Sequence, residues 1–305
     1  MSGKDKPKKE HFFMEKRRVV YLDNNATTRV APEVSQAMLS LLEEEYGNPS
    51  SKHFLGCQAA KLVQEARERV AHLLGCHAEE IIFTSCGTEG DNLAIRGIAE
   101  LLPSNKRHLI TTSVEHPAVK NTMEYLRKRG YEISILKVDR DGLIDIEELK
   151  SKLRKETGLV SIIYANNETG VILPIEEVGR ILKEREIAFH VDAVQAVGKI
   201  PICLRESSID LLTLSGHKLH GPKGIGALYI RHGIQLHPLL LGGNQERGLR
   251  GGTEATPAIV GLGKAAELAA RDLESRNLQI QRKRDRLEKW ILENIPHTRR
   301  NGHPT

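Results

Sequence analysis

The sequence predicts an α/β fold in which a mixed, mainly parallel sheet is flanked by helices and followed by an incomplete small domain. Short β-branched runs alternate with charged amphipathic stretches from residue 107 to residue 230, an alternation that is typical of βαβ units. A nearly continuous run of helix-forming residues then extends from 264 to 295, where Pro296 ends it. With 305 residues, 39% of them hydrophobic, the chain is long enough to bury a core of this size.

The individual elements follow from where each apolar run begins and ends. A strand that ends near Thr84 leads into a helix over about 89–99. Strands and helices then alternate until two strands follow each other closely. We expect strands at residues 107–112, 131–138, 159–165, 187–191, 211–214 and 226–230, and helices at 118–129, 146–155 and 175–186. In a parallel sheet, ligands bind beyond the carboxyl ends of the strands, so the loops that follow these strands are where a site is expected.

The chain divides into three parts. Residues 1–18 form a charged N-terminal extension, residues 19–262 form the large domain, and residues 263–305 hold the long helix and the start of a small domain. A helix of that length normally packs against other elements. We therefore expect the chain to stop inside its second domain.

Charge and cysteine content exclude several classes of protein. Lysine and arginine outnumber aspartate and glutamate by 45 to 40, but much of the excess lies in the first 18 residues, so no nucleic-acid partner is predicted. No apolar run is long enough to cross a membrane, and the N-terminal segment lacks the apolar region of a secretory signal. The cysteines are too few and too scattered for a disulfide framework or a metal site, so we expect no metal, a reducing, cytoplasmic location and mostly buried thiols. They are Cys57, Cys76, Cys86 and Cys203.

Two charged residues stand where a reacting group is expected. Lys218 lies in a loop of small residues just after the strand at 211–214, and Asp192 directly follows the strand at 187–191. Either could be ordinary, the lysine as a solvated surface residue and the aspartate as the cap of the following turn. If the cofactor is pyridoxal phosphate (PLP), however, a lysine can bind it covalently and a carboxylate can hold its ring nitrogen protonated.

Polar residues follow other strands as well. Gly87 and Thr88 begin the helix after the first strand, so their N–H groups could bind a phosphate, although Thr88 could equally be an ordinary N-cap. His116 follows the strand at 107–112, and Asn167 follows the strand at 159–165. The glycine-rich segment at 221–226 lacks the ending of a P-loop and precedes a strand, so it indicates neither a nucleotide triphosphatase nor a dinucleotide fold. The convergence of several strand ends on one crevice is the strongest indication of a site.

Six ordered motifs closely resemble those of the cysteine desulfurases of the NifS/IscS type, in the class V aminotransferase group of PLP enzymes, with the NifS branch nearest. The motifs are residues 21–28 (YLDNNATT), 46–51 (YGNPSS), 113–116 (SVEH), 165–170 (ANNETG), 215–218 (SGHK) and 245–253 (QERGLRGGT). The resemblance extends from about residue 19 to residue 300. It implies the type I PLP-dependent transferase fold, with a mixed seven-stranded sheet in the large domain and a homodimer.

The resemblance also implies a role for each matching residue. Lys218 would bind PLP covalently and then move protons, Asp192 would pair with the ring nitrogen, and Gln195 would bond the phenolic oxygen. His116 would stack on the ring and assist proton transfer, and Asn167 would lie near the ring substituents. The phosphate would be held by Gly87, Thr88, Ser215 and His217, with Thr253 reaching it from the neighbouring subunit.

The implied reaction converts L-cysteine to L-alanine and an enzyme-bound persulfide, whose sulfur goes to an iron-sulfur scaffold or another acceptor protein. Selenocysteine lyases resemble the same motifs, and a PLP-binding remnant without catalysis is a further alternative. In the family, a cysteine on a mobile loop takes up the sulfur and an arginine binds the substrate carboxylate, both in the C-terminal small domain. Neither position is matched in this sequence, so we assign no nucleophile and expect the 305 residues alone to be inactive.

Overall fold

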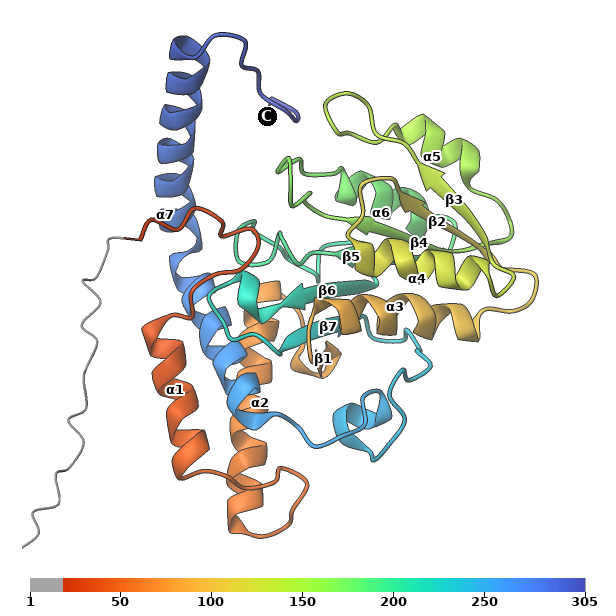
Figure 1. The fold of residues 1–305 in the computed structure, drawn as a ribbon. Coiled ribbons are helices and arrows are strands. Elements are labelled where there is room, and N and C mark those ends of the chain that lie inside the picture. Colours follow the sequence, from red (N-terminus) through yellow and green to blue (C-terminus); the bar gives the residue numbers. More distant parts are fainter. Residues whose placement is uncertain (1–18, 305) are drawn as a thin grey trace, which may run out of the picture.

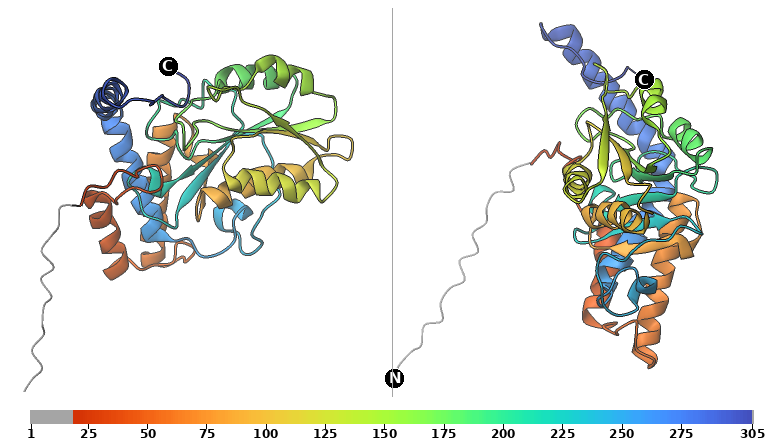
Figure 2. Two further views of the ribbon diagram at one scale, coloured as in Figure 1. Left: turned by 45° about the horizontal axis from the view of Figure 1, so that its top comes forward. Right: turned by 90° about the vertical axis from the view of Figure 1, so that its right-hand side faces the viewer.

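A seven-stranded sheet with helices on both faces forms the centre of the computed structural model, which describes residues 19–304 (Figures 1 and 2). The predicted charged extension at 1–18 lies outside the described residues. The strands are β1 (Ile81–Thr84), β2 (His108–Thr112), β3 (Glu132–Leu136), β4 (Thr157–Ile163), β5 (Ala188–Asp192), β6 (Leu211–Ser215) and β7 (Gly226–Ile230). Their order across the sheet is β1-β7-β6-β5-β4-β2-β3. Only β7 runs antiparallel to its neighbours, so the predicted mixed, mainly parallel sheet is confirmed.

The apolar character of the strands follows from their position between two layers of helices. Every residue of β1, β2, β4, β6 and β7 is buried, whereas the edge strand β3 is largely exposed. A parallel sheet covered on both faces needs continuous apolar strands, because each side chain meets a helix whichever way it points. The β-branched runs of the sequence supply them.

Two helical layers enclose the sheet. The helices are α1 (Pro32–Glu43), α2 (Phe54–Leu74), α3 (Gly87–Leu101), α4 (Pro117–Arg127), α5 (Ile146–Lys152), α6 (Ile175–Lys183) and α7 (Thr256–Asn294). The apolar residues of α3 and α4 form one core cluster with one face of the sheet. Those of α2, α5, α6 and the first half of α7 form a larger cluster on the opposite face.

Most of the predicted elements are present, with shifts of a few residues at their ends. The helices α1 and α2 were not predicted, because they precede the region where strands and helices alternate. The long C-terminal helix begins at Thr256 rather than at residue 264, so the predicted domain division after residue 262 falls inside α7. In the described part of the chain, no helix combines the length and the apolar character needed to cross a membrane.

Helix α7 has a buried half and an exposed half. Up to Ala269 it packs on α1 and α2, and its contact with α2 depends on Gly263, where an added Cβ would lie 2.6 Å from Ala66 Cα. Beyond residue 270 the helix extends past the sheet domain (Figure 2), and its apolar side chains Leu287 and Trp290 are more than half exposed. The segment after the helix turns back, and an added Cβ on Gly302 would lie 3.1 Å from the Val171 side chain.

A buried ion pair joins α2, β1 and the turn at Gln245–Gly248. Both N–H ends of the Arg67 guanidinium donate to the Glu246 carboxylate at 2.8 Å, and Arg67 also donates to the Ile81 carbonyl at 2.7 Å. The Phe83 N–H donates to the same carboxylate at 2.8 Å. Bidentate geometry and complete hydrogen bonding are what a buried ion pair needs to offset its desolvation.

Glu246→Ala is expected to lower the free energy of unfolding by about 3–5 kcal/mol, because it leaves the Arg67 cation buried without a counterion. Urea denaturation followed by circular dichroism measures the change. Glu124→Ala is the matched control, since Glu124 pairs with Arg127 on an exposed helix face and such pairs contribute about 0–1 kcal/mol. Equal effects of the two substitutions would contradict the assignment.

Candidate active site

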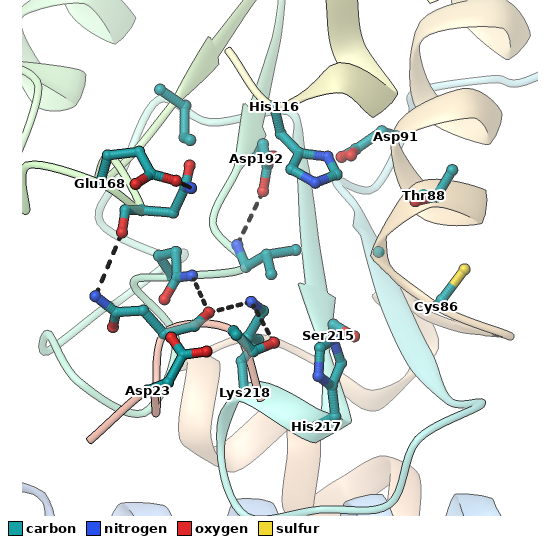
Figure 3. A pocket seen from close by; sticks show the side chains of 17 residues that line it. Asp23, Cys86, Thr88, Asp91, His116, Glu168, Asp192, Ser215, His217 and Lys218 are labelled. Carbon is teal, nitrogen blue, oxygen red and sulfur yellow. Dashed lines mark hydrogen bonds between the residues drawn. The ribbon is translucent and has the colours of Figure 1, made fainter. Parts of the chain in front are cut away.

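A cavity of about 560 Å³ opens where the carboxyl ends of β2, β4, β5 and β6 meet the N-terminus of α3 (Figure 3). A segment from the N-terminal part of the chain closes it, through Asp23, Asn25 and Ala26. Nine of the ten residues predicted for the site line this one cavity. They are Gly87, Thr88, His116, Asn167, Asp192, Gln195, Ser215, His217 and Lys218. Thr253 does not line it, and its predicted role toward a neighbouring subunit stays a prediction.

Lys218 lies on the short 3-10 turn Gly216–Lys218 that follows β6. Its Nζ donates to the carbonyls of Asn25 and Ala26, the latter at 3.0 Å. Burial lowers the pKa of Lys218, while the carboxylates of Asp192 and Asp23 act in the opposite direction. A lysine whose amine is more easily deprotonated is a better nucleophile toward a carbonyl group.

Asp192 ends β5 with 3% of its surface exposed. It accepts a hydrogen bond from the Val194 N–H at 3.0 Å, so it caps the following turn and lines the cavity as well. Burial raises the pKa of Asp192, and the Val194 N–H and the positive charges of His116 and Lys218 lower it. A buried carboxylate of this kind is stabilised by a cation placed against it.

The N-terminus of α3 is open to the cavity. The helix begins at Gly87 with Cys86 as its N-cap, and no side chain in the described part of the chain caps it, so the alternative of an N-cap by Thr88 is wrong. A Cβ on Gly87 would lie 2.7 Å from the Val194 side chain, which favours glycine there. The buried Ser215 Oγ has no hydrogen-bond partner within the described residues. Free N–H groups and an unpartnered hydroxyl make this end of the cavity suited to a phosphate.

His116 and Asn167 also line the cavity. His116 is the N-cap of α4, where its Nδ1 accepts a hydrogen bond from the Ala118 N–H at 3.2 Å. It therefore combines the capping role with a place in the cavity, close to Asp192 (Figure 3). The Asn167 carbonyl accepts a hydrogen bond from Asn25 Nδ2 at 3.3 Å, which links the closing segment to this side of the site.

A group of buried titratable residues behind the cavity was not predicted. Asp91 lines the cavity from α3, and burial raises its pKa. His190 Nε2 lies 3.6 Å from Asp91 Oδ1, and burial lowers the pKa of His190 to about 3, so this imidazole is neutral. Burial raises the pKa of Glu115 to about 8. The sequence does contain one sign of such buried groups, which is a polar residue inside an apolar strand, such as His190 between Phe189 and Val191.

The prediction of mostly buried thiols is wrong. Cys76 is buried, and its pKa is raised to about 12 mainly by burial, but Cys57 and Cys203 are exposed and Cys86 is half-buried. Cys86 lines the cavity next to the open end of α3, and its sulfur points away from Lys218 (Figure 3). Cys57 lies in the first turn of α2, Cys86 is the N-cap of α3, and Cys203 lies outside the helices and strands.

Comparisons with known proteins agree with one another. The family described as "Aminotransferase class-V" matches residues 20–305. A protein named "Cysteine desulfurase" from Trichormus azollae is 57% identical over 287 residues, which are 94% of this chain and 72% of that protein. "Cysteine desulfurase NifS" from Azotobacter vinelandii is 51% identical, covering 93% of this chain and 71% of that protein. These two alignments leave more than a quarter of each relative unmatched.

Two solved structures are similar to the whole fold. A structure titled "NIFS-LIKE PROTEIN" superimposes with a TM-score of 0.88 and 45% identity, over 90% of this chain and 76% of that one. A second, titled "SspA in complex with cysteine", has a TM-score of 0.79 and 43% identity, over 81% of this chain and 72% of that one.

The buried carboxyl of Glu115 predicts a pH dependence of stability. Its pKa is about 8 in the folded protein against 4.5 in the reference state, so between these values the folded state holds a proton that the unfolded state has lost. The free energy of unfolding therefore falls as the pH rises through this window, by at most about 1.4 kcal/mol per pH unit.

Glu115→Gln keeps the hydrogen bonds that Glu115 Oε1 accepts from Thr112 and Ile163 and removes the titration. Urea denaturation at several pH values should give a flatter dependence for this variant than for the wild type. Glu43→Gln, at an exposed position on α1, should retain the wild-type dependence. An unchanged slope in Glu115→Gln would show that the carboxyl does not titrate in this range.

Proposed function

Because this chain belongs to the class V aminotransferase family, and within it to the cysteine desulfurases of the NifS/IscS type, we propose that its cavity binds PLP and L-cysteine for a reaction that yields L-alanine and transfers the sulfur to a thiolate. One observation carries the proposal: a half-buried lysine, a buried carboxylate and an open helix N-terminus line the same cavity. The substrate is supported by the names of the relatives and by the solved complex of SspA with cysteine.

The donor set of the cavity fits PLP at both ends of the molecule. Gly87 and Thr88 at the start of α3 would hold the phosphate, together with the unpartnered hydroxyl of Ser215 and with His217. Asp192 would face the ring nitrogen, because a protonated pyridine supplies the cation that its buried carboxylate lacks. When bound, the protonated ring would supply an electron sink for the substrate carbon next to the amine.

The remaining residues of the chain hold the cofactor and move protons. Lys218 Nζ would hold the cofactor, and its amine would take up and return a proton of the substrate. His116 would stack on the ring and assist at the same atom, Gln195 would donate to the phenolic oxygen, and Asn167 would contact the ring substituents. All four line the cavity, which supports these roles.

We also propose a homodimer in which Thr253 completes the phosphate site of the partner. Its support is the position of Thr253 outside its own cavity and a set of large apolar side chains at the surface of the N-terminal segment, α1 and α2. They include Val19, Leu22, Leu42, Tyr46 and Phe54, more than single scattered residues would explain. A sulfur-accepting protein of iron-sulfur cluster assembly and a cytoplasmic location complete the proposal.

Covalent attachment through Lys218 is the first test. After incubation with PLP and reduction with borohydride, peptide mapping should find the modification at Lys218, and Lys218→Ala should abolish it. Lys223→Ala, in the exposed loop beyond the 3-10 turn, should load as well as the wild type. Labelling at Lys223 or no labelling at all would refute the assignment.

The second test concerns turnover. We propose that residues 1–305 alone do not release alanine from L-cysteine, because sulfur transfer needs a thiolate within about 3–3.5 Å of the substrate sulfur. Cys76 is buried, Cys57 and Cys203 do not line the cavity, and Cys86 lies at the phosphate end. Alanine release is measured in the presence of dithiothreitol. Robust turnover that disappears in Cys86→Ser would identify Cys86 as the nucleophile instead.

A further inference from the structure

The side-chain amide of Gln195 is held from both sides. Lys199 Nζ donates to its oxygen, Oε1, at 2.6 Å, and its nitrogen, Nε2, donates to the Asn25 carbonyl at 2.9 Å. Gln195 has 8% of its surface exposed and lines the cavity. Each end of the amide therefore has a fixed partner.

Lys199 itself is a half-buried lysine that has no counterion among residues 19–304. No carboxylate of residues 19–304 forms an ion pair with it, and its side-chain partner in that range is the Gln195 oxygen. Burial and the positive charges of Lys218 and Arg276 lower the pKa of Lys199 to about 8. An unpaired cation is costly to bury. We therefore expect the contact of Lys199 with Gln195 to have a function.

The turn that carries Lys199 is fixed by α7. Arg276 donates to the Gly198 carbonyl at 2.7 Å, and Asn277 donates to the Lys199 carbonyl at 2.6 Å. Gly198 has a φ of 73°, and a Cβ there would lie 3.3 Å from the Cβ of Ala269. The Lys199 backbone is thus anchored while its side chain reaches Gln195.

These contacts allow one orientation of the amide. An ammonium group only donates hydrogen bonds and a backbone carbonyl only accepts them. Turning the amide over would place Gln195 Nε2 against Lys199 and Oε1 against the Asn25 carbonyl, and both contacts would be lost. In the observed orientation, Nε2 keeps a second N–H that has no partner within the described residues.

We propose that Lys199 is a positioning residue that fixes the Gln195 amide with its nitrogen, and not its oxygen, toward the phenolic oxygen of bound PLP. The inference rests on the proposed function, since it takes PLP as the bound group. An amide N–H donates to a phenolate, whereas an amide oxygen would repel it. Without Lys199, only the Asn25 carbonyl would hold the amide in this orientation.

A double-mutant cycle tests this role. Lys199→Met should weaken PLP binding about 3- to 10-fold, the range expected for one hydrogen bond, and should change the visible absorbance of the bound cofactor. Lys199→Arg, which keeps a donor, should restore both. In the Gln195→Leu background, Lys199→Met should have no further effect, because the amide that it orients is gone. The dissociation constant is measured by fluorescence titration with PLP.

Controls separate positioning from folding. Lys264→Met removes a partly buried lysine of α7 that pairs with Glu267 away from the cavity and should bind PLP like the wild type. If Lys199→Met does not fold, Lys199→Thr keeps a polar side chain that is too short to reach Gln195. Equal losses in the wild-type and Gln195→Leu backgrounds, or no loss in either, would overturn the inference while the proposed function stands. A wild-type protein that does not bind PLP would overturn both.

Discussion

The hydrogen bonds between Thr28 and the backbone around His217 hold the N-terminal segment against one side of the cavity. The Thr28 N–H and hydroxyl both donate to the His217 carbonyl, at 2.9 and 2.8 Å, and the His220 N–H donates back to the Thr28 hydroxyl at 2.8 Å. These three hydrogen bonds place the N-terminal segment across the end of the sheet. The Asn25 carbonyl can therefore accept hydrogen bonds from both Gln195 and Lys218. Without those three hydrogen bonds, the amine and the amide would lose the partner that sets their positions relative to each other.

The charged groups around the cavity suit a ligand that carries both a positive and a negative charge. Two buried carboxyl groups line the cavity, and burial raises the pKa of both Asp192 and Asp91. The cavity is also lined by Lys218, whose pKa burial lowers, and by the N-terminus of α3, which no side chain of the described residues caps. A cationic ring nitrogen and an anionic phosphate on one flat molecule would satisfy both sets of groups at once.

The cavity residues that follow strand ends could be predicted from the sequence, whereas the contacts between distant segments around them could not. Strand ends can be read from local patterns, and polar residues placed there meet because a parallel sheet brings its carboxyl ends to one edge; Asp192 and Lys218 were found in this way. The contact of Gln195 with Asn25 spans 170 residues, and the burial of Asp91 depends on how α3 meets the sheet. Contacts of this kind leave no periodic signal in the sequence. The exposure of the cysteines could not be predicted either, because it also depends on contacts between distant segments.

Helix α7 is joined by hydrogen bonds to the turn beside Gln195. The helix contains 39 residues, about 58 Å at 1.5 Å per residue. Its buried half packs against α2. Just where the helix leaves the core, Arg276 and Asn277 donate hydrogen bonds to the carbonyls of Gly198 and Lys199. These two hydrogen bonds connect the exposed half of α7 to the turn that contacts Gln195, so a displacement of that half would reach the turn through them.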